Sequence, residues 1–169
     1  MKKIQVHKTL SYTSSISIKA DGNTIWDNIT NVQIEQFSDP IIFKILGIPK
    51  PLKAEIITRE MGGKRIAYFD SGKRFLQEIT TWSPNTKYSF DFNPEKGFIV
   101  GHVFDIADGV FRILSGNYVL SKTGESITLE LTTSYSLDRR IYFLLNTPVL
   151  IILKIFQRYL LTSIKENCE

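Results

Sequence analysis

The sequence predicts an α+β fold in which an antiparallel sheet is covered by one long C-terminal helix. Between residues 54 and 136, about six short apolar or alternating segments are separated by turn residues, as in a meander of strands. After Pro148 the chain continues to Glu169 without another proline or glycine, and its apolar residues recur at three- and four-residue steps. Strands followed by one amphipathic helix favour a sheet whose apolar face the helix covers.

The first strand is expected over residues 12–20, where Ile16 and Ile18 share one side. Residues 1–10 precede it and are expected to form an N-terminal arm. The length of 169 residues suits a single domain spanning residues 1–169, since domains commonly hold about 100–200 residues.

Two short helices are expected after the first strand. The first begins at Asn23 or Thr24, either of which can cap a helix N-terminus, and it carries Trp26. The second is expected over residues 32–37. A connector is expected over residues 43–52, because its prolines disfavour both a helix interior and the centre of a sheet.

The later strands are expected between clusters of turn residues. The clearest pattern belongs to the last strand, where Leu129 and Leu131 fall on one side and Glu130 on the other. Within residues 94–110, the run 98–104 is apolar but contains a glycine and a histidine, and it fits either a strand or a folded loop. The expected strands cover residues 54–59, 65–69, 74–82, 88–92, 111–121 and 126–136.

The terminal helix is expected to begin at Thr147-Pro148, because proline suits the first helical turn, where its missing N–H would lack a partner anyway. The stretch 141–161 is the one candidate for a membrane span. Polar and charged residues interrupt it, whereas a spanning helix needs about 20 mainly apolar residues, so burial in a core is favoured. The expected apolar face consists of Val149, Ile152, Leu153, Phe156, Tyr159, Leu160 and Ile164.

Composition argues against several classes of function. The net charge is +4, but the basic residues are scattered among 17 acidic ones, which indicates solubility and not nucleic-acid binding. A single cysteine, Cys168, and two distant histidines indicate no metal site, and no cofactor is expected. Glycine-rich phosphate loops and the Gly-x-Ser-x-Gly motif are absent. The cysteine usage and an N-terminus without an apolar signal segment predict a cytoplasmic location.

Four local patterns occur in order along the chain. They are Ala20-Asp21 before a helix with Trp26, Phe75-x-x-Glu78-Ile79-x-x-Trp82-Ser83-Pro84, the hairpin from Gly116-x-Tyr118-x-Leu120 to Leu129-x-Leu131-x-Thr133-x-Tyr135, and the ending Ile164-Lys165-Glu166. In this order the sequence resembles the START-like, or SRPBCC, superfamily, which includes polyketide cyclase-like proteins, the birch-pollen-allergen fold and lipid-transfer domains.

The resemblance implies a helix-grip fold, in which a curved antiparallel sheet of six to seven strands wraps around the terminal helix. It also implies a cavity between the sheet and that helix. Members of the superfamily bind or carry hydrophobic small molecules, and a minority catalyse cyclisation or related reactions. The resemblance brings no catalytic motif, because the superfamily has none in common.

The candidate ligand-binding residues are aromatic and polar side chains of the strands, the 98–104 run and the terminal helix. Small-molecule sites are mostly apolar with a few polar anchors, and buried Tyr and Trp need a partner for their polar group. Ordinary core packing is the alternative for each residue, and no residue is assigned a catalytic role. The set is Tyr68, Glu78, Trp82, Tyr88, Phe90, His102, Tyr118, Phe156 and Tyr159.

Two members of this set are candidate general bases. Glu78 shares a strand side with Leu76 and Trp82, and its alternation fits both a cavity position and an outer one. His102 is a histidine, the side chain that titrates nearest neutrality, but it has no identifiable carboxylate partner. A histidine bonded to backbone or exposed in a loop is the favoured interpretation.

Three functions remain open from the sequence. The leading one is binding or transport of an apolar or amphipathic small molecule, lipid-like or polyketide-like. The second is a cyclase- or hydrolase-type enzyme that uses Glu78 or His102 as base, with Tyr118 or Tyr88 orienting the substrate. The third is a module that contacts a membrane or a partner through the apolar segment 143–155. Membrane contact is less favoured than a small-molecule partner, and nothing in the sequence specifies an oligomeric state.

Overall fold

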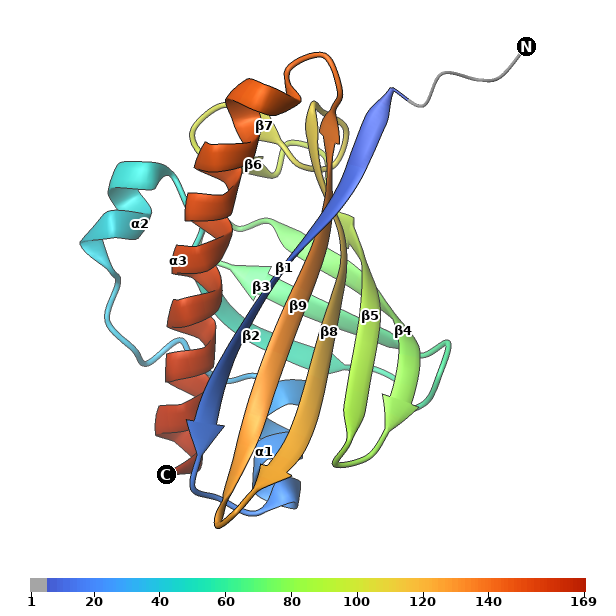
Figure 1. Cartoon of the computed structure of the whole chain (residues 1–169), viewed down its shortest axis with the longest axis vertical. Helices are drawn as coiled ribbons and strands as arrows, with labels where there is room; N and C mark the ends of the chain where they lie inside the picture. Colours follow the sequence, from blue (N-terminus) through green and yellow to red (C-terminus); the bar gives the residue numbers. More distant parts are fainter. Residues whose placement is uncertain (1–5) are drawn as a thin grey trace.

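The computed structural model describes residues 6–169, and the part of the expected N-terminal arm in residues 1–5 lies outside them. Seven antiparallel strands form one sheet in the order β1-β9-β8-β5-β4-β3-β2, which curves around the long helix α3 (Figure 1). The sheet strands are β1 (His7–Ile18), β2 (Pro51–Ile56), β3 (Lys64–Phe69), β4 (Arg74–Ser83), β5 (Lys87–Pro94), β8 (Phe111–Thr123) and β9 (Ser126–Asp138). The other elements are α1 (Gly22–Thr30), α2 (Ile41–Leu46), α3 (Tyr142–Cys168) and a two-stranded ribbon of β6 (Ile99–Val100) and β7 (Phe104–Asp105).

The first and last strands of the sequence lie side by side. β1 pairs with β9 from His7 opposite Asp138 to Ile18 opposite Ile127. Residues 7–10, expected in an arm, therefore belong to the sheet.

All six expected strands are present, and the last one has the predicted faces. Leu129 and Leu131 are buried in β9, whereas Glu130 is exposed. In β4 the alternation changes at a β-bulge between Ile79 and Thr81. The bulge turns Trp82 to the inner side of the sheet, so Trp82 no longer shares a face with Glu78.

The second short helix lies further along the chain than expected. Residues 32–37 do not form a helix, because the backbone N–H of Ile34 donates to the Leu52 carbonyl at 2.9 Å and joins this segment to β2. α2 instead follows Pro40, whose φ of −64° suits a helix start, and ends at Gly47 in the left-handed region with φ of 62°. The expected connector at 43–52 therefore contains residues 43–46 of α2 and the first two residues of β2.

α3 begins at Tyr142 and contains Pro148 in its interior, whereas the sequence predicted a start at that proline. Pro148 and Leu144 are both exposed, so the Leu144 carbonyl that loses its helical N–H partner lies next to solvent. Within residues 6–169, α3 is also the one helix that is long and apolar enough to cross a membrane by length and composition. One side of it packs on the sheet, and this side includes the fully buried Val149 and Ile164.

A buried glutamine fastens α3 to the sheet. Gln157 is fully buried, and its amide nitrogen donates to Thr133 Oγ1 at 2.8 Å and to the Tyr12 carbonyl at 3.2 Å. Its amide oxygen accepts from the Ser14 hydroxyl. These bonds join α3 to both β1 and β9 and thereby fix the rotation of the helix about its axis.

Replacing this glutamine tests the attachment. Gln157→Leu should lower the free energy of unfolding by about 2–4 kcal/mol, because groups on β1 and β9 lose their buried partner. Urea unfolding followed by tryptophan fluorescence measures this change. Arg158→Leu is the matched control at the exposed neighbouring position, where an effect within about 0.5 kcal/mol is expected. Equal effects of the two substitutions would contradict the anchoring role.

Candidate functional site

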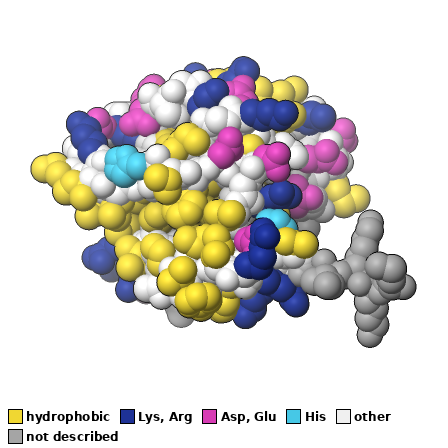
Figure 2. All heavy atoms as spheres, turned by 90° about the horizontal axis from the view of Figure 1, so that it is seen from above, with side chains coloured by type: hydrophobic (Ala, Val, Ile, Leu, Met, Phe, Trp, Pro, Cys, Tyr) yellow, Lys and Arg dark blue, Asp and Glu magenta, His cyan; other side chains and the backbone are white. Residues whose placement is uncertain are grey.

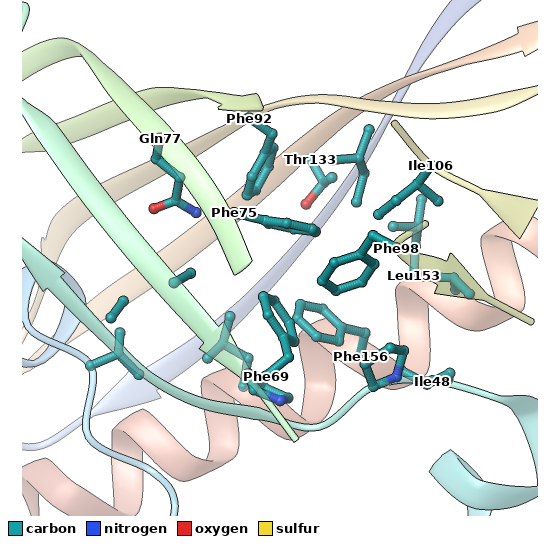
Figure 3. A pocket seen from close by; sticks show the side chains of 18 of the residues that line it. Ile48, Phe69, Phe75, Gln77, Phe92, Phe98, Ile106, Thr133, Leu153 and Phe156 are labelled. Atoms are coloured by element: carbon teal, nitrogen blue, oxygen red, sulfur yellow. The ribbon is translucent and has the colours of Figure 1, made fainter. Parts of the chain in front are cut away.

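A cavity of about 100 Å³ lies between the sheet and α3. Aromatic rings from several elements surround it, with Phe69, Phe75, Phe98 and Phe156 pointing toward one another (Figure 3). The rings of Phe69 and Phe98 are 4.9 Å apart between centroids, and those of Phe75 and Phe98 are 4.5 Å apart. The wall is thus mainly apolar and rich in aromatic rings, as is typical of small-molecule sites.

Glycine at position 116 shapes one wall of this cavity. A Cβ atom on Gly116 of β8 would lie 2.7 Å from the ring of Phe90 on the neighbouring strand β5. The absence of that atom lets the Phe90 ring pack against the β8 backbone at this position.

The volume limits what the cavity holds in this conformation. Sites for drug-sized ligands commonly measure about 300–1,000 Å³, whereas an apolar cavity of about 150 Å³ is known to hold one benzene ring. At about 100 Å³ the cavity has room for one small apolar group. A longer ligand must displace side chains or extend out of the cavity.

The segment containing α2 covers the cavity between β2 and α3. Phe43 of α2 packs against Phe156 and Tyr159 of α3, with ring centroids 6.4 and 4.9 Å apart. His102 Nε2 bonds to the Ile45 carbonyl at 3.0 Å, which ties the β6–β7 ribbon to the last turn of α2. Ile48, Pro49 and Pro51, which follow α2 in the chain, line the cavity on this side.

One cluster of polar side chains in the cavity wall centres on Arg65 of β3, and Lys53 of β2 and Thr133 of β9 are further polar lining residues. Arg65 is 3% exposed and Gln77 of β4 is 2% exposed, and both line the cavity. The Arg65 guanidinium donates to the Gln77 amide oxygen at 2.8 Å, to the Thr30 carbonyl at 3.1 Å and to the Ile29 carbonyl at 3.0 Å. The two carbonyls belong to the C-terminal end of α1, where the helix dipole is negative.

Two buried tyrosines lie beside this guanidinium. Tyr118 lines the cavity, and its ring stacks on Tyr88 at 6.4 Å between centroids. Burial raises the pKa of Tyr118 to about 12 and also raises the pKa of Tyr88, although the charge of Arg65 opposes both shifts. Both hydroxyls are therefore neutral donors near pH 7. The buried Tyr88 hydroxyl has no hydrogen-bond partner within residues 6–169.

The structure brings three of the nine candidate ligand-binding residues together at the cavity, namely Phe90, Tyr118 and Phe156. The others lie elsewhere. Tyr88 and Trp82 pack with Trp26 of α1 in a second core cluster. Tyr159 packs on Phe43, and Tyr68 lies beside the Lys53 amino group. Glu78 and His102 are exposed.

The positions of Glu78 and His102 bear on the enzyme hypothesis. Glu78 is exposed on the outer face of β4, and His102 bonds to α2 through backbone. Within residues 6–169 the cavity lining contains no histidine, cysteine or carboxylate, and no three metal-ligating side chains gather anywhere. The geometry therefore gives no support to acid–base chemistry by these two residues.

Sequence reasoning missed Arg65 and Gln77. A signal was present, because strand alternation places Arg65 on the same side as Ala67 and Phe69, and Gln77 on the same side as Phe75 and Ile79. The predicted set contained aromatic residues and candidate bases, and it did not include an arginine or a glutamine on the inner face.

Comparison with known proteins shows the fold. The sequence matches no protein-family model and no curated protein. Protein Mll3558 from Rhizobium loti has 11% identity and a TM-score of 0.58, and the match covers 95% of this chain and 98% of that one. The di-domain ARO/CYC BexL from the BE-7585A biosynthetic pathway has 13% identity and a TM-score of 0.57, over 95% of this chain and 50% of that one. Ara h 8.0201 has 11% identity and a TM-score of 0.51, over 92% of this chain and 99% of that one.

The chain therefore has a helix-grip fold, the fold that the resemblance of its sequence patterns implied. Identities of 11–13% show the fold alone and not the ligand.

Removing one aromatic wall tests whether the cavity binds ligands. Phe156→Ala should enlarge the cavity and tighten binding of the neutral apolar dye Nile red, measured by fluorescence titration. Because Phe156 is partly exposed, the loss of unfolding free energy should stay below the roughly 3–5 kcal/mol of a fully buried phenylalanine. Phe143→Ala, at an exposed position of the same helix, should change neither quantity. A loss of roughly 3–5 kcal/mol of unfolding free energy with unchanged dye binding would mean that Phe156 only packs in the core and does not border a ligand site.

Proposed function

We propose that this protein binds or carries an apolar or amphipathic small molecule in the cavity between its sheet and α3. The observation that carries the proposal is an aromatic cavity with Arg65, Gln77 and Tyr118 gathered on one wall. Apolar walls supply affinity, and a few polar groups at one place orient a ligand that has a polar end. Lipid-like and polyketide-like molecules both meet this description, and a cytoplasmic location belongs to the same proposal.

Native mass spectrometry after gentle purification tests the proposal. A small molecule should remain bound to a fraction of the protein, and its mass would define the ligand class. The control is the same protein unfolded in guanidinium, washed and refolded, which should lose the extra mass. Protein that repeatedly carries no small molecule, and that also fails to bind Nile red after refolding, would contradict the proposal.

A second candidate function, contact with an anionic membrane, is favoured by an apolar surface at one end of the molecule. We call this the apical surface, and Figure 2 shows hydrophobic side chains gathered there. Large patches of exposed apolar side chains mark interaction sites, and exposed basic residues such as Lys44 and Arg139 would attract anionic lipids. The apical surface consists of Ile41 and Ile45 of α2, Val103 of the β6–β7 ribbon, and Phe143 and Leu144 of α3.

Vesicle flotation tests this second candidate. The protein should float with vesicles of phosphatidylglycerol more than with vesicles of phosphatidylcholine, because only the former attract the basic residues. Changing Phe143 and Leu144 together to serine should abolish flotation. The matched control changes Ile57 and Met61, two exposed apolar residues away from the apical surface, to serine and should float normally. Absence of flotation by the unmodified protein would contradict membrane contact.

A further inference from the structure

Arg65 is a buried cation without a buried anion. Within residues 6–169, no carboxylate lies within 4.0 Å of its guanidinium. The other buried basic side chain, Lys50, behaves differently, because its amino group pairs with Asp39 at 2.7 Å. Buried charges in proteins are ordinarily paired, so the environment of Arg65 calls for a physical explanation.

The protein itself stabilises the Arg65 charge only in part. Carbonyl groups at the end of α1 accept two hydrogen bonds from it, and the faces of Tyr88 and Phe90 lie 5.6 and 5.4 Å from its central carbon. These are partial charges and ring quadrupoles, which do not amount to a full negative charge. In surroundings of low dielectric, the remaining positive potential extends into the cavity.

The guanidinium also keeps hydrogen-bonding capacity. Of its five N–H groups, three are used, one each by Thr30, Ile29 and Gln77. One N–H on each terminal nitrogen is left without an acceptor among residues 6–169. Gln77 uses its amide oxygen toward Arg65, which leaves its NH₂ group to donate. Tyr118, whose hydroxyl is neutral near pH 7, lines the same cavity.

We propose, building on the binding function above, that the ligand is an amphipathic carboxylic acid whose ionised carboxylate binds Arg65. Its apolar part lies among the aromatic rings, and Gln77 and Tyr118 are placed to donate further hydrogen bonds to the carboxylate. A carboxylate supplies both the missing charge and two acceptor oxygens that match the planar guanidinium. A neutral ligand would leave the cation unpaired.

A matched pair of probes tests the charge requirement. Hexanoate and 1-hexanol have the same chain length and differ in their polar end, and hexanoate is ionised at pH 7.5 because carboxyl groups titrate near pH 4. NMR titration of the full chain with each probe gives both affinities. We expect hexanoate to bind about tenfold or more tightly than 1-hexanol, since hydrogen bonds to charged groups are the strong ones.

Two variants remove the free cation in different ways. Gln77→Glu places a carboxylate against Arg65 and neutralises it with the side chain still in place, whereas Arg65→Gln removes the charge and with it part of the cap on α1. Each should reduce the preference for hexanoate over 1-hexanol to about twofold or less, through weaker binding of hexanoate. Gln33→Glu, the same substitution at an exposed position, should keep the full preference. Near-UV circular dichroism checks that each variant is folded. If Arg65→Gln does not fold, the result for Gln77→Glu alone decides the test.

Three results would overturn the inference. Equal or weaker binding of hexanoate would mean that Arg65 serves only to cap α1, and the binding function would still stand on 1-hexanol. A preference for hexanoate that survives Gln77→Glu would place the carboxylate away from Arg65. Binding of neither probe would count against the binding function and the inference together.

Discussion

Packing of α3 into the curved sheet is the interaction on which the rest of this structure depends. A sheet with one apolar face needs a cover, and each fully buried aliphatic side chain such as Val149 or Ile164 contributes roughly 1.5–3 kcal/mol. α3 packs mainly on β1 and β9, at one edge of the seven-stranded sheet. The opposite edge strand, β2, curves past the helix, and the phenylalanine rings between them do not fill the space completely. The cavity is therefore a consequence of covering a wide curved sheet with a single helix.

Two buried polar side chains show how structural and ligand-directed roles differ in this core. Gln157 has partners on β1 and β9 for both ends of its amide, so its polarity serves to position α3. Arg65 is equally buried, yet its charge has no opposite charge among the described residues and its group faces the cavity. A buried polar residue with a structural role needs hydrogen-bond partners for all its polar atoms within the protein. A buried cation in a cavity wall that lacks an anionic partner is instead suited to bind the negative charge of a ligand.

The sequence predicted the elements whose signals are local and repeated. Alternation in β9 and the three- and four-residue spacing of α3 predicted both elements and their buried faces, and the order of patterns implied the helix-grip fold. Residues 32–37 were assigned to a helix because their pairing partner, the start of β2, is distant in sequence. The prediction that Trp82 and Glu78 share a face was wrong because a single inserted residue at a bulge reverses the alternation that follows it. The sequence did not predict the charged part of the site, because the residues around Arg65 come from α1, β3 and β4. That these neighbours include no carboxylate is known only from the folded structure.

The location of a bound apolar chain tests the central claim most directly. Isotope-filtered NOE measurements on the labelled protein with unlabelled 1-hexanol report which methyl groups contact the chain, whether or not Arg65 contributes. The account predicts NOEs to Ile106, Leu131 and Leu153, which line the cavity between the sheet and α3. NOEs confined to Ile41 and Ile45 on the apical surface, with none to the cavity methyl groups, would contradict it.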